Sequence, residues 1–298
     1  MQVPAQVEYE KAASVADTLT LLERYGPVAR ILAGGHSLIP MMKLRLVHPE
    51  VLIDINGLSD LEYITVSPDG SSVSIGALTR HAGLLASDLV GEHFQILSDA
   101  ERVIADAVVR EWGTIGGSLC QADPSEDLSA AFAALKGSMI ITGSGGAREV
   151  SAREFHTGPY ETVVGPAEML TEIRLPVHSG GRGTGTGSAY VKVSRRAGDW
   201  AVGAAGAWVR MAGGQIEDAG IGLAALGATH FVAAEAEEFL AGRDMSEDVL
   251  ARAGQIAAEN CHPPADQRGP ADYKKHLAAE LTARALRAAV TRARGRTA

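Results

Sequence analysis

Two short glycine-rich segments give the clearest chemical signal in this chain of 298 residues. Residues 33–37 read Ala-Gly-Gly-His-Ser, and residues 114–118 read Thr-Ile-Gly-Gly-Ser. Glycine lets a backbone turn tightly and approach a ligand without a Cβ in the way. Consecutive backbone N–H groups beside a hydroxyl and a helix N-terminus are typical of a pyrophosphate site. Each segment alone is more simply an ordinary loop turn, but two in one chain favour a dinucleotide ligand.

The predicted dinucleotide site is not of the Rossmann type. The first segment lacks the third glycine of GxGxxG, although Asp54 lies at a tolerable spacing for the acidic ribose ligand. Gly220-x-Gly222 also fails, because its next glycine is Gly227 and because it begins a strand. The stretch 179–188 has neither this register nor the Lys-Ser/Thr ending of a phosphate loop, so we interpret it as a flexible linker.

The sequence offers no convincing catalytic machinery of its own. Gly35-His36-Ser37 lacks the second glycine of a nucleophile elbow, and no acid–base pair stands out. Two cysteines are too few for an iron–sulfur cluster, and neither CxxC nor HExxH occurs, so no protein-held metal is expected. These absences fit a protein whose bound cofactor supplies the chemistry.

Elements with clear hydrophobic patterns must position the two glycine segments. A helix after Ser14, a strand at 29–33, a helix at 38–46 and a strand at 51–55 form a strand–turn–helix–strand unit around the first segment. Further strands are expected at 72–75, 138–142, 147–151 and 172–176, and helices at 84–89, 96–108 and 128–135. The remainder predicts hairpin strands at 200–211 and 215–226, then helices at 231–240, 246–260 and 270–294. This order indicates an α+β fold divided into 1–57, 58–177 and 178–298.

Composition and charge narrow the class of function. A formal net charge of −9 without a lysine-rich block argues against binding to nucleic acid or anionic membranes. No stretch approaches the roughly 18 apolar residues of a transmembrane segment. The N-terminal residues also lack the pattern of a secretory signal, so we expect a cytoplasmic protein.

The glycine segments and their flanks resemble those of the FAD-binding subunits of molybdenum hydroxylases, the xanthine dehydrogenase family. The resemblance rests on 33–43 with Leu-Ile-Asp-Ile at 52–55, and on 113–118 continuing through Asp-Pro at 123–124 to Asp127. It extends to 190–200 and 266–273 and covers about residues 7–294. It implies a two-subdomain FAD-binding module of the p-cresol methylhydroxylase type, followed by a small C-terminal α+β domain.

The resemblance also implies how noncovalently bound FAD is held. Both glycine segments would bind the pyrophosphate between the subdomains, and Asp127 would hydrogen-bond the nucleotide. Ile104 and Leu170 match pocket-lining positions, Lys192 matches a lysine that contacts the cofactor, and Trp200 matches an aromatic residue near the isoalloxazine. The full expected set is Ala33, Gly34, Gly35, His36, Ser37, Ile104, Thr114, Ile115, Gly116, Gly117, Ser118, Asp127, Leu170, Lys192 and Trp200.

Several of these residues have simpler interpretations. Lys192 suits a solvent-exposed strand, Asp127 suits a helix N-cap, and Trp200 suits a core position. His36 could attach flavin covalently, as histidine does in some oxidases of this superfold, but the resembled family binds FAD noncovalently. Trp112 stands where many relatives carry arginine; it could contact the ligand or fill a gap, and we favour packing. Many relatives also carry asparagine in place of Ser118.

The resemblance finally implies a place in a larger enzyme, with aerobic carbon monoxide dehydrogenases as the most similar branch. The molybdenum cofactor would lie on a large subunit and two [2Fe–2S] clusters on a small one, in a dimer of heterotrimers. Electrons would pass through FAD to a quinone-type acceptor, and any attachment to the inner face of the membrane would occur through partners. The alternatives are a sibling hydroxylase of an N-heterocycle or aldehyde, a stand-alone flavin oxidoreductase, and a cofactor-free assembly module.

Overall fold

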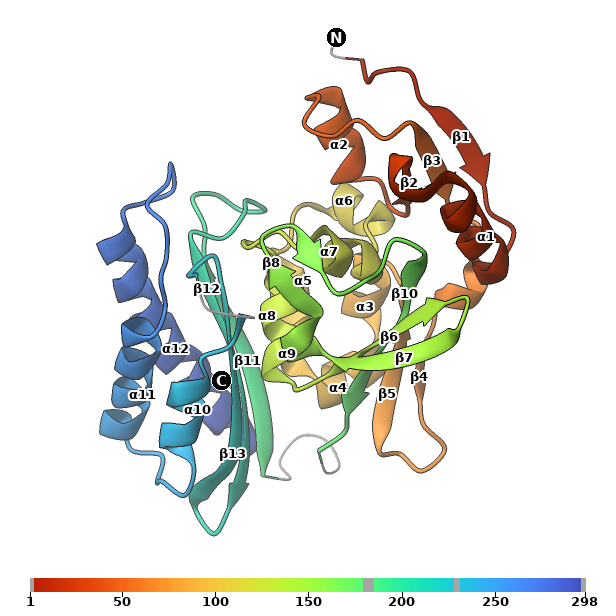
Figure 1. The fold of residues 1–298 in the computed structure, drawn as a ribbon. Coiled ribbons are helices and arrows are strands. Elements are labelled where there is room, and N and C mark those ends of the chain that lie inside the picture. The colour runs from red at the N-terminus through yellow and green to blue at the C-terminus, as the bar shows by residue number, and fades with distance from the viewer. Residues whose placement is uncertain (1–2, 179–184, 228–230, 296–298) are drawn as a thin grey trace.

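The computed structural model describes residues 3–178, 185–227 and 231–295 and confirms the α+β class (Figure 1). The N-terminal unit is a three-stranded parallel sheet in the order β1 (Glu8–Lys11), β3 (Val51–Asp54), β2 (Ala29–Leu32). The helix α1 (Val15–Tyr25) and the 3-10 turn η1 (Gly26–Val28) precede β2, and α2 (Leu38–Lys43) follows it. The predicted strand–turn–helix–strand unit is therefore confirmed, and β1 is a strand that the pattern did not predict.

Local chemistry explains where these helices begin and end. The Ser14 hydroxyl accepts a hydrogen bond from the Asp17 amide and caps α1. The helix expected to reach residue 46 stops at Lys43, because Arg45 takes φ 59° in the left-handed region.

The middle of the chain forms an antiparallel sheet covered by short helices. Its strand order is β4 (Ile64–Val66), β5 (Ser72–Gly76), β10 (Glu168–Pro176), β6 (Ser138–Gly143), β7 (Gly146–Ser151). Its helices are α3 (His81–Ala86), α4 (Asp88–His93), α5 (Gln95–Val103), α6 (Ala107–Trp112), α7 (Ile115–Gln121), α8 (Asp127–Ala134) and α9 (Ala152–Phe155). Smaller elements are η2 (Ser59–Leu61), β8 (His156–Gly158) and β9 (Glu161–Thr162). The single helix predicted at 96–108 is two helices, because Ala105 takes φ 47° and Asp106 caps a new start.

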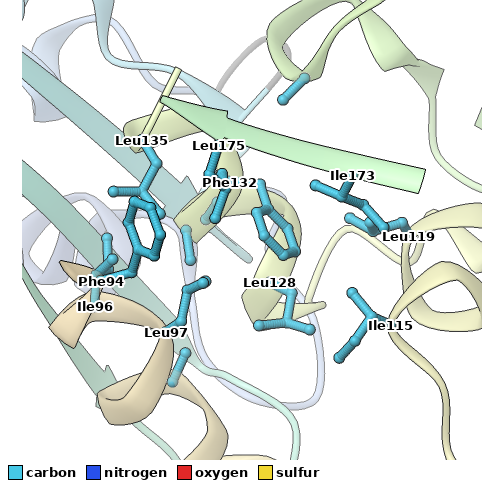
Figure 2. Packing of buried hydrophobic residues seen from close by; sticks show 14 of the residues in the cluster. Phe94, Ile96, Leu97, Ile115, Leu119, Leu128, Phe132, Leu135, Ile173 and Leu175 are labelled. Atoms are coloured by element: carbon cyan, nitrogen blue, oxygen red, sulfur yellow. The ribbon is translucent and has the colours of Figure 1, made fainter. Parts of the chain in front are cut away.

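The core of this middle part surrounds α8, all of whose residues are buried. Figure 2 shows Phe94, Leu128 and Phe132 gathered beside the strand that carries Ile173 and Leu175. Burial of such apolar side chains is the main favourable contribution to folding. The neighbouring helices and strands therefore pack against α8.

The C-terminal part is an antiparallel sheet between α8 and the last helices (Figure 1). Its strands are β11 (Thr186–Val193), β12 (Gly203–Ala212) and β13 (Gln215–Ala224), and its helices are α10 (Ala234–Leu240), α11 (Glu247–Glu259) and α12 (Ala271–Ala293). A Cβ at Gly220 or Gly222 would overlap the carbonyl oxygens of Ala134 or Ala130 in α8. Glycine at these two positions thus permits the close contact between α8 and β13.

The expected linker at 179–188 differs in part from the structure. Residues 179–184 lie outside the described residues, and residues 186–188 begin β11 by pairing with 208–210 of β12. Within the described ranges, no helix is long and apolar enough to cross a membrane. The same ranges hold no group of three or more His, Cys, Asp or Glu side chains that could bind a metal ion.

Candidate functional site

The first glycine segment forms the turn between β2 and α2. Gly35 takes φ +76°, a conformation that favours glycine. Within the described residues, nothing accepts a hydrogen bond from the backbone amides of Gly34, Gly35, His36 or Ser37. These N–H groups are therefore available to an anionic ligand. The His36 side chain is exposed, and its Nδ1 lies 3.0 Å from the carbonyl oxygen of Gly34.

The second glycine segment begins α7 and is largely occupied by its own structure. Thr114 is the N-cap, and its Oγ1 accepts from the Gly117 amide at 3.1 Å. Four amides of the segment donate to acceptors within the chain, namely those of Ile115, Gly116, Gly117 and Ser118. This segment thus differs from the first, because it has few free amides and offers a ligand mainly the exposed Gly117 and the Ser118 hydroxyl.

The two glycine segments lie against each other. A Cβ on Gly34 would overlap the carbonyl oxygen of Trp112 and would lie 2.8 Å from the Cα of Gly113. A Cβ on Gly117 would lie 3.9 Å from the Cβ of Ala33. Glycine is therefore required where the N-terminal unit meets the start of α7. The structure thus brings together the two segments that the sequence singled out.

Two polar side chains, Arg80 and Asn56, form hydrogen bonds that connect the two sides of this contact. The Arg80 guanidinium donates to the carbonyl oxygen of Trp112 and, at 3.1 Å, to Asn56 Oδ1. Asn56 Nδ2 in turn donates to the carbonyl oxygen of Ala33 at 2.5 Å and to Asp54 Oδ1 at 2.8 Å. This bridge connects the first segment to the residues just before the second, and the sequence analysis did not identify it.

These features fit the pyrophosphate of FAD. Free, consecutive backbone N–H groups are suitable donors to phosphate oxygens. The residues that would supply them are those of the 33–37 segment, with the exposed edge of the 114–118 segment opposite. The glycines keep side chains out of the contact between the two segments.

Ser118, His81 and Glu101 form a line of three hydrogen-bonded side chains with the Ser118 hydroxyl at one end, and sequence reasoning missed this line. Ser118 Oγ lies 2.8 Å from His81 Nε2, and His81 Nδ1 lies 2.9 and 3.1 Å from the two oxygens of Glu101. His81 and Glu101 are buried, at 3% and 0% exposure, whereas Ser118 is half-buried. Residues 81 and 101 lie far from 118 in sequence, so no local motif could have revealed the line.

Asp127 and Lys192 form a buried ion pair with each other. Lys192 Nζ lies 2.7 Å from Asp127 Oδ2 and 3.2 Å from the carbonyl oxygen of Val103. The Tyr190 hydroxyl donates to Asp127 Oδ1 at 2.8 Å. Two sequence-based alternatives are therefore wrong: Lys192 is not an exposed strand lysine, and the N-cap of α8 is Glu126.

Glu126 is a further buried acid that the sequence analysis did not identify. Its carboxylate accepts hydrogen bonds from the amides of Leu128 and Ser129 at 2.8 and 2.6 Å. Burial raises the pKa of Glu126 to about 7, although the Ser129 hydrogen bonds oppose the shift. This carboxyl group therefore titrates near neutral pH beside the Asp127–Lys192 pair.

The remaining predicted residues occupy different environments. Leu170 is buried in the core, and Ile104 is half-buried against the same cluster. Trp200 is 42% exposed, so the core interpretation of this residue is wrong. Trp112 is 56% exposed, so the expectation that its side chain packs is also wrong.

Two protein families match this chain. Residues 5–178 match the family described as FAD binding domain in molybdopterin dehydrogenase. Residues 188–289 match the family described as CO dehydrogenase flavoprotein C-terminal domain. Both glycine segments and the three-residue line that ends at Ser118 lie within the first of these ranges.

Individual relatives match over almost the full length. The chain is 39% identical to the carbon monoxide dehydrogenase medium chain of Afipia carboxidovorans, over 98% of this chain and 99% of that one. It is 35% identical to the glyceraldehyde dehydrogenase medium chain of Sulfolobus acidocaldarius, over 95% and 98%. A crystal structure of cyanide-inactivated Cu,Mo-CO dehydrogenase matches with a TM-score of 0.92 at 39% identity, covering 97% of this chain and 99% of that one.

Proposed function

The chain belongs to the family of FAD-binding medium chains of molybdopterin dehydrogenases, and from this premise we propose that it is the FAD-carrying electron-transfer subunit of an aerobic carbon monoxide dehydrogenase. The observation that carries the proposal is the contact between the two glycine segments, with free amides at residues 34–37. The full-length similarity to a carbon monoxide dehydrogenase medium chain supports the choice of branch.

Bound FAD would supply the redox chemistry, because a flavin takes up single electrons and releases pairs. The chain's own residues bind and orient it. The amides of 34–37 and the Ser118 hydroxyl would donate hydrogen bonds to the pyrophosphate. Ile104 and Leu170 would line the FAD pocket. Asp127 and Lys192 would place one carboxylate and one ammonium group beside the cofactor, and the exposed Trp200 would cover the isoalloxazine.

The proposal includes partners and an acceptor. The molybdenum cofactor and [2Fe–2S] clusters would lie on a large and a small subunit, in a dimer of heterotrimers, and the acceptor would be a quinone. The two cysteines of this chain are too few to hold a cluster, which supports that division. We propose a cytoplasmic complex, any membrane attachment being through partners, and a division of this chain at 57/58 and 177/178.

The test is the visible spectrum of the chain purified with its natural partners, before and after anaerobic addition of carbon monoxide. Bleaching of the flavin bands is the expected result. Flavin that stays oxidised in a preparation active on another substrate would contradict the carbon monoxide assignment. The glyceraldehyde dehydrogenase relative makes an aldehyde the first such substrate to try, and N-heterocycles the next. A colourless complex that binds no added FAD would contradict the cofactor assignment itself.

A further inference from the structure

We propose that the Glu101–His81 pair determines whether the Ser118 hydroxyl donates a hydrogen bond to the pyrophosphate of FAD, so that FAD affinity depends on one proton held by this pair. The inference rests on the proposed binding of FAD between the two glycine segments. It assigns His81 and Glu101 as positioning residues, because they act through Ser118.

The geometry links the proton on the Glu101–His81 pair to whether the Ser118 hydroxyl donates or accepts a hydrogen bond. When the pair holds its proton, Nε2 of His81 carries a hydrogen and donates to Ser118 Oγ across 2.8 Å. The Ser118 hydrogen is then free to donate to a phosphate oxygen. This holds whether Glu101 or Nδ1 carries the other shared hydrogen. When the proton is lost, Nδ1–H still donates to Glu101, and Nε2 becomes an acceptor that takes the Ser118 hydrogen. The hydroxyl then presents only lone pairs to an anion.

The surroundings of the pair favour its protonated state. Burial opposes a charge on His81, but the Glu101 carboxylate on α5 and its hydrogen bond raise the pKa of His81 above its ordinary value. Glu126 at the start of α8 acts in the same direction, and Arg110 of α6 acts against it. Asp127 also faces this region, with its charge paired to Lys192. FAD affinity should therefore be high at low pH and fall as pH rises.

The same three residue types in line serve as a nucleophile, base and orienting acid in hydrolases. Here the serine lies inside α7, one residue after Gly117, where an added Cβ would lie 3.9 Å from the Cβ of Ala33 in the first glycine segment. That placement aims the line at a phosphate-binding surface, and the sequence 35–37 supplies no nucleophile elbow.

The experiment is a titration of the flavin-free full-length chain with FAD, followed by flavin fluorescence from about pH 6 to about pH 9. The wild-type Kd is expected to rise about tenfold across this range, the typical effect of losing one hydrogen bond to a charged group. Ser118→Ala should bind weakly at every pH with a flat profile. An unchanged Kd and an unchanged pH profile in Ser118→Ala would overturn the proposal.

Two substitutions of His81 separate positioning from simple packing. In His81→Gln the side-chain amide reaches the position of Nε2 and donates at any pH, so affinity should stay high and flat. In His81→Asn the amide replaces Nδ1 and does not reach Ser118, so the hydroxyl has no titratable neighbour and the pH profile should also be flat, without the weak binding of Ser118→Ala. His93→Gln on α4 is the matched control and should keep the wild-type profile. A wild-type slope in His81→Gln would place the titrating group elsewhere and overturn the proposal.

A measurement on the unmodified chain keeps the test valid if a variant fails to fold. If protonation of the chain favours FAD binding, thermodynamic linkage requires that FAD binding also causes the chain to take up protons. Calorimetry of FAD binding at neutral to mildly alkaline pH, in buffers of different ionisation enthalpy, should reveal that uptake. Zero uptake together with a flat wild-type profile would overturn the inference while leaving FAD binding intact. Failure to bind FAD at any pH would instead contradict the proposed function.

Discussion

Lys192 Nζ lies 2.7 Å from Asp127 Oδ2, and their side chains are only 3% and 5% exposed. The pair connects β11 of the C-terminal sheet to the first turn of α8 in the middle part of the chain. A buried charge is tolerated only when it is paired and hydrogen-bonded, and here Tyr190 and the Val103 carbonyl complete the arrangement. Two residues expected to contact the cofactor thus also join two parts of the fold.

Lys192→Met should destabilise the protein by about 3–5 kcal/mol, because it leaves the Asp127 carboxylate buried without its cation. Urea unfolding monitored by far-UV circular dichroism measures this change. Combining Lys192→Met with Asp127→Asn should cost much less than the sum of the single variants. Arg252→Met, which breaks an exposed ion pair, should change stability by less than about 1 kcal/mol. Additive effects of the two buried substitutions would refute this description of the pair.

Gly34→Ala should weaken FAD binding strongly. The new Cβ would overlap the carbonyl oxygen of Trp112, so the two glycine segments would have to separate. Fluorescence titration with FAD measures the loss. Gly91→Ala in α4 is the control, because a Cβ there meets nothing within 4 Å and alanine favours the helix. Wild-type FAD affinity in Gly34→Ala would show that the contact is not needed for binding.

Asn56→Ala should lower FAD affinity without unfolding the protein. The substitution removes the hydrogen bond to the Ala33 carbonyl and leaves the Arg80 guanidinium without one acceptor. We expect a loss of about tenfold in affinity, the scale of one or two hydrogen bonds that position the binding loop. The comparison is Ser67→Ala, which removes hydrogen bonds from an exposed turn in the middle sheet. Equal FAD affinities of the two variants would count against the Arg80–Asn56 bridge.

Glu126 should make the folded state less stable as pH rises. Because burial raises its folded pKa to about 7, its contribution is complete at low pH and is lost as pH rises from its ordinary pKa of 4.5 through 7. Wild type should lose roughly 3 kcal/mol more than Glu126→Gln between about pH 4 and about pH 8. Urea midpoints at several pH values test this, with the exposed Glu111→Gln as control. Parallel pH curves for wild type and Glu126→Gln would refute the assignment.

Local sequence was sufficient for features that depend on neighbouring residues. The glycine segments, the parallel unit around the first of them and the 138–151 hairpin follow from turn chemistry and hydrophobic pattern. The break at Ala105 was missed because a left-handed alanine leaves no sequence signal. The strand β1 was missed because its short, mostly polar sequence becomes a strand only by pairing with β3.

The polar contacts behind the site could not be predicted from the sequence, and the physical reason is a different one. His81, Glu101 and Ser118 meet only after α3, α5 and α7 have packed, and Arg80 meets Asn56 only when the first two sheets are placed together. Lys192 was identified by resemblance, but its burial depends on β11 lying beside α8. Contacts of this kind are set by tertiary structure and not by spacing along the chain.

We expect this chain to bind FAD noncovalently between its two glycine segments. The most direct test is the flavin content of the purified full-length chain, measured by absorbance and by acid release into the supernatant. About one FAD per chain is expected, all of it released by acid, with flavin lost in Gly34→Ala and retained in Gly91→Ala. A chain that is colourless and binds no added FAD, or one whose flavin stays attached after acid treatment, would contradict it.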